Sequence, residues 1–108
     1  MSDILQDLLA VIQSRRDNPQ EGSYTCYLFD KGLDKILKKL GEECVETIVA
    51  AKNGDNGATT REICDLLYHL LVLVASQDIE WREIIAELRA RRAKIGNLKT
   101  MRETDKDT

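Results

Sequence analysis

Apolar residues near the start of the chain recur every three or four positions, which predicts an amphipathic helix. They are Ile4, Leu5, Leu8, Leu9, Val11 and Ile12. Ser2 or Asp3 can cap this helix, and we expect it to run to about Arg16. The segment 17–32 holds the only proline and two glycines, so it is predicted to be an ordered loop. A short strand at 24–29 is an alternative, but it would have no evident partner.

A second apolar stripe predicts a helix from about residue 31 to residue 52. Its members are Leu33, Ile36, Leu37, Leu40, Cys44, Ile48 and Ala51. The run NGDNG (53–57) follows directly, and its glycines and asparagines are typical of a helix end. This helix is therefore predicted to stop near Lys52.

Two more helices are predicted after this turn. Thr59 and Glu62 have the spacing of a capping box at the start of the third helix, which continues through Ser76. Its body is apolar on nearly every side, which predicts a central, buried helix. Asp78 can cap a fourth helix at about 79–95, which Gly96 ends. The buried face of that fourth helix would consist of Trp81, Ile84, Ile85, Leu88 and Ile95.

The predicted fold is all-α, with four main helices in one domain over residues 1–96 and a polar, frayed tail at 97–108. A helix that is apolar on every side needs neighbours on every side. Three other helices of this length barely supply them, because small domains bury little surface on their own. We therefore expect a homo-oligomer, most simply a two-fold homodimer.

Composition narrows the classes of function. The net charge of −3 argues against a general binder of phosphate backbones, and 5% aromatic residues argue against a stacking platform for single-stranded nucleic acid. The longest apolar run, 70–75, is too short to span a membrane, and the N-terminus lacks the basic region of a signal peptide. The three cysteines are widely spaced and include no C-x-x-C pair, which favours a reducing cytoplasm.

Carboxylates gather on two of the predicted helices. In KKLGEECVE (38–46), Glu43 and Glu46 lie about 60° apart on a helix, and both flank its apolar stripe. On the third helix, Glu62, Asp65 and His69 form one polar stripe on an otherwise apolar surface. A buried carboxylate without compensation costs at least several kcal/mol. This stripe therefore needs protonation, a basic partner or a metal ion.

The metal hypothesis rests on two matching pairs, E-x-x-E at 43–46 and E-x-x-D at 62–65. Packed antiparallel, the two helices would bring four carboxylates to one point, and hard oxygen donors suit Mg²⁺ or Mn²⁺. A di-iron bundle would need two E-x-x-H pairs, whereas this chain has one histidine.

Each of these features also has a plainer explanation. Glu42, Glu43 and Glu46 taken alone are typical of a solvated face, as are the neighbouring lysines, some of which would neutralise phosphate beside a metal. His69 alone is typical of a satisfied core histidine or of a partner to a ligand. Gly41 is either tolerated within the helix or allows a phosphate or another helix to approach closely.

Three motifs carry a family resemblance. The segments GSYT (22–25), KLGEE (39–43) and DLLYHLLVL (65–73) closely resemble phosphoribosyl-ATP pyrophosphatases of histidine biosynthesis. ELRARR (87–92) is similar to the C-terminal helix of that family, so the resemblance spans roughly residues 3–95. The combination of E-E-x-x-E with E-x-x-D also marks the wider all-α, MazG-like superfamily of nucleotide pyrophosphatases. The implied fold is thus a MazG-like helical bundle completed by oligomerisation.

The resemblance implies hydrolysis of 1-(5-phosphoribosyl)-ATP to 1-(5-phosphoribosyl)-AMP and diphosphate with Mg²⁺, or with Mn²⁺ in its place. Its metal ligands would be Glu43, Glu46, Glu62 and Asp65. In that setting Glu42 or Glu46 would take the proton of the attacking water.

The remaining side chains expected to contact substrate are Lys35, Lys39, Ser23, Tyr24, Thr25 and His69. Lys35 and Lys39 would contact phosphate oxygens, and the GSYT segment would hold a ribose or a phosphate. The alternative for GSYT is a turn that caps a helix.

Two competing functions stay open at this point. One is a house-cleaning pyrophosphatase that acts on non-standard nucleoside triphosphates. The other is a non-enzymatic helical oligomerisation module whose acidic cluster is incidental. No nucleic-acid or membrane partner is expected under any of the three hypotheses.

Overall fold

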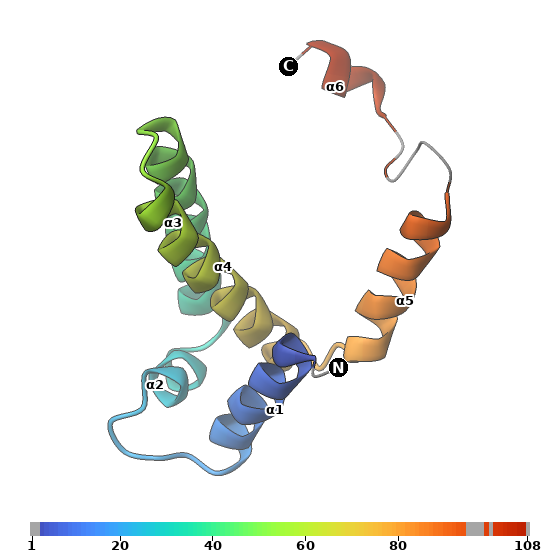
Figure 1. Ribbon diagram of the computed structural model, residues 1–108. Helices are drawn as coiled ribbons and strands as arrows, with labels where there is room; N and C mark the ends of the chain where they lie inside the picture. The colour runs from blue at the N-terminus through green and yellow to red at the C-terminus, as the bar shows by residue number, and fades with distance from the viewer. Residues whose placement is uncertain (1–2, 95–98, 100, 108) are drawn as a thin grey trace.

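The computed structural model of the chain describes residues 3–94, 99 and 101–107, and every regular element within them is a helix, which confirms the all-α prediction. The described residues form six helices, which Figure 1 labels in chain order. They are α1 (Ile4–Asp17), α2 (Tyr24–Lys31), α3 (Leu33–Lys52), α4 (Asn56–Ser76), α5 (Trp81–Ala93) and α6 (Glu103–Asp107). Over the described residues, no helix combines the length and the apolar character needed to cross a bilayer.

Helix α1 begins and ends close to where its apolar pattern predicts. The Asp3 carboxylate accepts a hydrogen bond from the backbone N–H of Gln6 at 3.0 Å, so Asp3 is the N-cap. Leu9 and Ile12, three positions apart on one face, are both buried. Leu5 and Leu8 pack against the same core, whereas Ile4 and Val11 are exposed, so only part of the predicted stripe faces the interior.

Helix α2 contradicts the prediction of a loop or short strand in this part of the chain. The Ser23 hydroxyl caps it by accepting from the backbone N–H of Cys26 at 3.2 Å, and Leu28 is fully buried. Gly32 ends it with a φ of 93°, a conformation that favours glycine. The same glycine delays α3 to Leu33, two residues after the predicted start. Eight residues with one buried leucine are too short for the apolar spacing to distinguish a helix from a strand.

The start of α4 also differs from its prediction. The helix begins at Asn56 because Asp55 caps it, accepting from the backbone N–H of Ala58 at 3.0 Å. Thr59 lies inside the first turn, and its hydroxyl donates to the backbone oxygen of Asp55 at 2.8 Å. The predicted capping box of Thr59 and Glu62 is therefore wrong, since the aspartate four residues earlier has taken that role.

The two longest helices, α3 and α4, form a hairpin around the turn at 53–55 and make the most extensive contact between elements. Figure 1 shows α1 and α2 beside one end of this hairpin, while the end with the turn extends away from them. The core lies at the covered end and consists of Leu9, Ile12, Leu28, Ile36, Leu71, Val72, Val74 and Ala75. One half of the hairpin thus contributes to the core, and the other half, which ends in the turn at 53–55, projects from it.

Helix α4 is buried only along its last turns, whereas the sequence predicts a central helix that is buried over its whole length. Leu71, Val72 and Ala75 in its last turns are buried, whereas Ile63 and Leu67 in its first half are 43% and 38% exposed. Periodicity alone could not reveal this, because it reports apolar character and not the presence of a neighbour.

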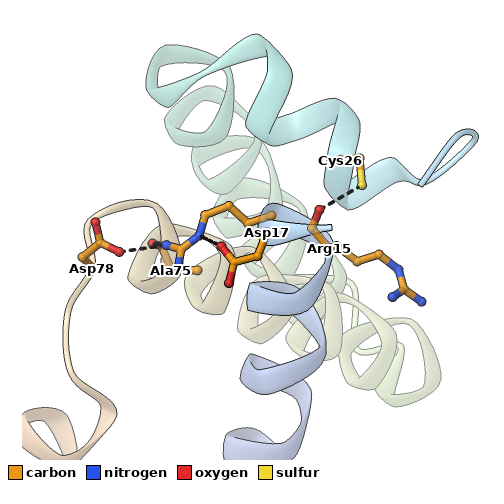
Figure 2. A network of polar contacts seen from close by, with 6 residues as sticks. Arg15, Asp17, Cys26, Ala75 and Asp78 are labelled. Atoms are coloured by element: carbon orange, nitrogen blue, oxygen red, sulfur yellow. Dashed lines mark hydrogen bonds and ion pairs between the residues drawn. The ribbon is translucent and has the colours of Figure 1, made fainter. Parts of the chain in front are cut away.

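The C-terminal end of α1 holds neighbouring segments together. The Arg16 guanidinium donates to the backbone oxygen of Ala75 and to Asp78 Oδ1, the latter at 2.8 Å. The Cys26 thiol donates to the backbone oxygen of Arg15 at 3.3 Å, and Figure 2 shows these contacts grouped around the last turn of α1. This end of α1 therefore joins both α2 and the end of α4.

Helix α5 also differs from its prediction. It begins at Trp81 after Glu80, and Asp78 binds Arg16 with a φ of 54° and does not cap it. No residue on α5 is buried, and Leu88 is 53% exposed. Figure 1 shows α5 leading away from the hairpin. Of the predicted buried face, Trp81 and Ile84 are partly buried and pack against the core, whereas Leu88 is exposed and Ile95 lies outside the described residues.

The tail predicted at 97–108 includes one short helix. Helix α6 spans Glu103–Asp107, and Asp105 accepts hydrogen bonds from the backbone and the side chain of Arg102. The division between a domain at 1–96 and a polar tail stays a prediction.

Candidate functional site

Three of the predicted carboxylates meet between α3 and α4. Glu43, Glu62 and Asp65 each offer a carboxylate oxygen, and these oxygens all lie within 4.8 Å of one another. Ile36, Glu43 and Ala50 are the buried residues of α3 and recur every seven positions, which is two turns of helix. Glu43 therefore occupies the side of α3 that packs against α4.

Glu43 is an unusual charged residue because it is only 7% exposed. Its Oε2 atom has no hydrogen-bond partner among the described residues, and the same is true of Glu62 Oε2. Burial raises the pKa of the Glu43 carboxyl first, and the charge of Glu46 raises it further. A buried carboxylate oxygen without a partner is costly, so these two atoms need a cation or a proton.

Glu62 has the most strongly shifted pKa of the group. Interaction with the Glu46 side chain is the largest cause, followed by burial and by interaction with the Glu43 side chain, and together they raise the pKa of Glu62 to about 7. Glu46 itself is exposed and lies outside the group of three oxygens. The structure thus places Glu46 beside the cluster and not within it.

A divalent cation fits this donor set. All the donors are carboxylate oxygens, which hard ions such as Mg²⁺ and Mn²⁺ prefer, and two of them are buried and unpartnered. A cation would offset the mutual repulsion that now raises the pKa values of Glu43 and Glu62.

Glu42 has a different environment from the clustered carboxylates. Its Oε2 accepts from the Lys39 ammonium at 2.9 Å. This hydrogen bond is the main cause that lowers the pKa of Glu42, with the charges of Lys39, Lys38 and Lys35 adding to it. Glu42 is therefore a weaker base than an isolated glutamate.

The lysines of α3 stand at its N-terminal end, one to two turns before the carboxylates. The Lys35 ammonium lies 5.9 Å from the ring centroid of Tyr27, and the Lys31 ammonium lies 5.8 Å from the same centroid. Sequence reasoning missed Tyr27. The four-residue spacing of Tyr27 and Lys31 was a signal, but the prediction of a loop at 17–32 concealed it.

The GSYT segment forms the start of α2. Ser23 accepts the capping hydrogen bond, as the alternative explanation of this motif predicts. Thr25 Oγ1 shares a hydrogen bond with the hydroxyl of Tyr68 on α4. These two oxygens are engaged within the protein, and their contact with substrate stays a prediction. Tyr68 was not among the residues predicted from the sequence.

His69 is 4% exposed and is held on both of its nitrogens. Nδ1 lies 2.7 Å from the backbone oxygen of Asp65, and Nε2 lies 3.0 Å from the Tyr24 hydroxyl. The Tyr68 ring meets it edge to face at 4.9 Å between centroids. This matches the alternative of a satisfied core histidine, so His69 would reach a ligand through Tyr24.

Gly41 is not explained by packing within the chain. A Cβ atom added to it would meet nothing within 4 Å. Close approach to Gly41, if it occurs, therefore involves a ligand or a second chain, and this part of the sequence prediction stays a prediction.

Comparisons with known proteins identify one family over most of the chain. The model of a family described as phosphoribosyl-ATP pyrophosphohydrolase matches residues 5–92. A phosphoribosyl-ATP pyrophosphatase of Clostridium botulinum (strain Hall) is 50% identical over 103 residues, which cover 95% of this chain and 94% of the relative. The corresponding protein of Pelotomaculum thermopropionicum is 53% identical over 92 residues, covering 85% and 94%. That of Listeria welshimeri is 48% identical over 102 residues, covering 94% and 98%.

Proposed function

The chain belongs to the phosphoribosyl-ATP pyrophosphohydrolase family, and we propose that it hydrolyses 1-(5-phosphoribosyl)-ATP to 1-(5-phosphoribosyl)-AMP and diphosphate in histidine biosynthesis, with Mg²⁺ at the α3–α4 carboxylates. The family match confirms the resemblance drawn from GSYT, KLGEE and DLLYHLLVL. The observation that supports the site is the group of three carboxylate oxygens within 4.8 Å, two of whose residues have a buried oxygen without a partner.

Glu43, Glu62 and Asp65 are the proposed ligands, and Glu46 stands next to them as a fourth. Mn²⁺ suits the same donors. A bound divalent cation supplies positive charge for the phosphate oxygens and for the diphosphate that leaves. Glu43 is held in place by its burial against α4, so it would present its oxygen without a change of backbone.

The proton of the attacking water needs a carboxylate base, and Glu42 and Glu46 are the two candidates. The ion pair with Lys39 lowers the pKa of Glu42, which weakens it as a base. Glu46 has a neighbour in Glu62 and no ion pair within the described chain. Glu46 is therefore the proposed base, and Glu42 is proposed to hold Lys39 in position.

Lys35 and Lys39 are the proposed phosphate contacts. The hydrogen bond with Glu42 is the main cause that raises the pKa of Lys39, so this ammonium stays charged. Ser23, Tyr24 and Thr25 at the start of α2 are proposed to hold a ribose or a phosphate of the substrate.

A two-fold homodimer completes the proposal. Val45, Ile48 and Val49 on α3 are 59%, 65% and 52% exposed, and Val45 lies roughly 160° round the helix from Glu43. These side chains form an apolar surface on the side of α3 away from α4, and a second chain would bury it. The three cysteines are free, which supports the proposed cytoplasmic location.

The test is release of diphosphate from phosphoribosyl-ATP by the purified chain, measured with Mg²⁺ and with EDTA. We expect turnover with Mg²⁺ and its loss in EDTA. Faster hydrolysis of dCTP or dUTP than of phosphoribosyl-ATP would favour the house-cleaning function. The absence of turnover on all of these nucleotides would favour the oligomerisation module.

A further inference from the structure

Two lysines approach the ring of Tyr27 at the corner between α2 and α3. The Lys31 ammonium lies 5.8 Å from the ring centroid, and the Lys35 ammonium lies 5.9 Å from it. The attraction of an ammonium to a tyrosine ring is weak at an exposed position, and two like charges beside one ring repel each other. The ring therefore holds two cations near one point without neutralising either of them.

Neither lysine has a counterion. Within the described part of the chain, Lys31 and Lys35 form no ion pair, although Asp30 and Asp34 directly precede them in the sequence. Adjacent residues of a helix point about 100° apart, so each aspartate faces away from the lysine that follows it. Two ammonium groups near one point attract an anion, and a phosphate offers enough oxygens to accept from both.

Tyr27 joins these lysines to an open hollow beside α2. Together with Ser23, Tyr24, Asp30 and others, its side chain lines a space of about 530 Å³, within the usual range for a small-molecule site. The Asp30 carboxylate repels a phosphate but accepts hydrogen bonds from sugar hydroxyls. The corner thus combines cations for a phosphate with an acceptor for hydroxyl groups, which suits a sugar phosphate.

Helix α3 connects this corner to the carboxylate cluster. Lys35, Lys39 and Glu46 lie within about 40° of one another around the helix, so they share one side of it. Lys39 Nζ donates to Glu42 Oε2 at 2.9 Å. The axial rise of an α-helix places Glu43 about 12 Å beyond Lys35. The two lysines at Tyr27 therefore form a second cationic point, separate from the proposed Mg²⁺ site.

Phosphoribosyl-ATP itself has two separate anionic groups, the triphosphate and the monophosphate of the ribose attached to N1 of adenine. We propose that Lys31 and Lys35 bind this monophosphate, and that Tyr27 is the positioning residue that holds the two ammonium groups together. The triphosphate then lies at the carboxylate cluster and Lys39. The inference rests on the proposed function and deepens it, because free nucleoside triphosphates lack the second phosphate that these lysines would recognise.

The test compares phosphoribosyl-ATP with ribosyl-ATP, the same molecule without the monophosphate. We expect kcat/KM of the unaltered chain for diphosphate release to fall about a hundredfold on ribosyl-ATP, since hydrogen bonds from two charged donors are lost. Lys31→Met and Lys35→Met should each lose about tenfold on phosphoribosyl-ATP, mainly through KM. On ribosyl-ATP neither variant should show a further loss.

Lys52→Met is the matched control, because Lys52 is an exposed lysine at the opposite end of α3. It should keep the full discrimination between the two substrates. Tyr27→Leu removes the ring that holds the ammonium groups and should reduce the discrimination about threefold, the size of an exposed cation–π contact. Tyr27→Phe keeps the ring and should restore the discrimination.

The pattern of losses separates the possible outcomes. Equal losses of Lys31→Met and Lys35→Met on both substrates would overturn the inference and assign these lysines to the triphosphate. Equal kcat/KM of the unaltered chain on both substrates would also overturn it, while the proposed function would stand. Unchanged discrimination in Tyr27→Leu would remove the positioning role of the ring. If the unaltered chain releases no diphosphate from either substrate, the proposed function fails and the inference falls with it.

Discussion

The two halves of α4 have the same backbone geometry but opposite surroundings. The C-terminal half carries Leu71, Val72 and Ala75 into the core against α1. The N-terminal half carries Glu62 and Asp65 to the carboxylate cluster, and its leucine and isoleucine side chains stay partly exposed. One half provides stability, while the other holds charges together that repel one another. The difference lies in the neighbours of each half and not in its helical propensity.

The largest expected effect is a loss of activity at the carboxylate cluster of α4 with the fold retained. Asp65→Asn keeps the shape of the side chain but removes one of the three clustered charges, so activity should fall on the order of 10³-fold, the equivalent of roughly 4 kcal/mol. The check is diphosphate release at saturating Mg²⁺ together with the circular dichroism spectrum. Glu87→Gln, an exposed carboxylate paired with Arg91 on α5, is the control and should leave the rate unchanged.

The next prediction compares the stability contributions of two leucines that lie one turn apart on α4. Leu71 is 3% exposed and Leu67 is 38% exposed. Leu71→Ala should lower the free energy of unfolding by about 2–5 kcal/mol, whereas Leu67→Ala should cost less than about 1 kcal/mol in a monomer. Urea denaturation measures both. If Leu67→Ala lowers the free energy of unfolding as much as Leu71→Ala, and the loss grows with protein concentration, a second chain covers the N-terminal half of α4.

The dimer has a direct test on α3. Val45→Glu places a charge in the exposed apolar surface of Val45, Ile48 and Val49, so the mass measured by sedimentation should fall from two chains to one. Ser14→Glu adds the same charge at an exposed position on α1 and should leave the mass unchanged. A mass of one chain for the unaltered protein at micromolar concentration would contradict the proposed homodimer.

The smallest expected effect concerns pH. The pKa of Glu62 is about 7 in the folded chain and 4.5 as its ordinary value, so folding favours the protonated form. Its contribution to stability is complete below pH 4.5 and is lost as the pH rises through 7. In EDTA, Glu62→Gln should therefore raise Tm at pH 8 and leave it nearly unchanged at pH 4.5.

Mg²⁺ provides the control for this pH effect. It should raise Tm of the unaltered chain at pH 8 more than it raises Tm of Glu62→Gln, because a bound ligand stabilises only the form that holds it. Thermal unfolding followed at 222 nm measures both effects. Identical Tm values for the two chains at pH 8 in EDTA would contradict the raised pKa of Glu62.

The predictions from sequence succeeded where a signal was long or chemically specific. The long apolar stripes located α1, α3 and α4 to within a few residues, and the spacing of Glu43, Glu62 and Asp65 identified the carboxylates that lie together. The same reasoning missed α2, because eight residues with one buried leucine do not define a period. It also placed the cap of α4 at Thr59, although Asp55 competes for the same backbone groups and lies one turn earlier.

The sequence by itself determined the all-α class, the family and the residue types of the site, because periodicity and motif spacing are properties of the chain alone. Only the tertiary structure decided which carboxylate is buried, that Glu46 lies beside the cluster, and that both nitrogens of His69 have partners within the chain. These outcomes depend on the packing of α2 and α3 against α4. A side chain's burial and the direction of its hydrogen bonds are set by neighbours that are distant in the sequence.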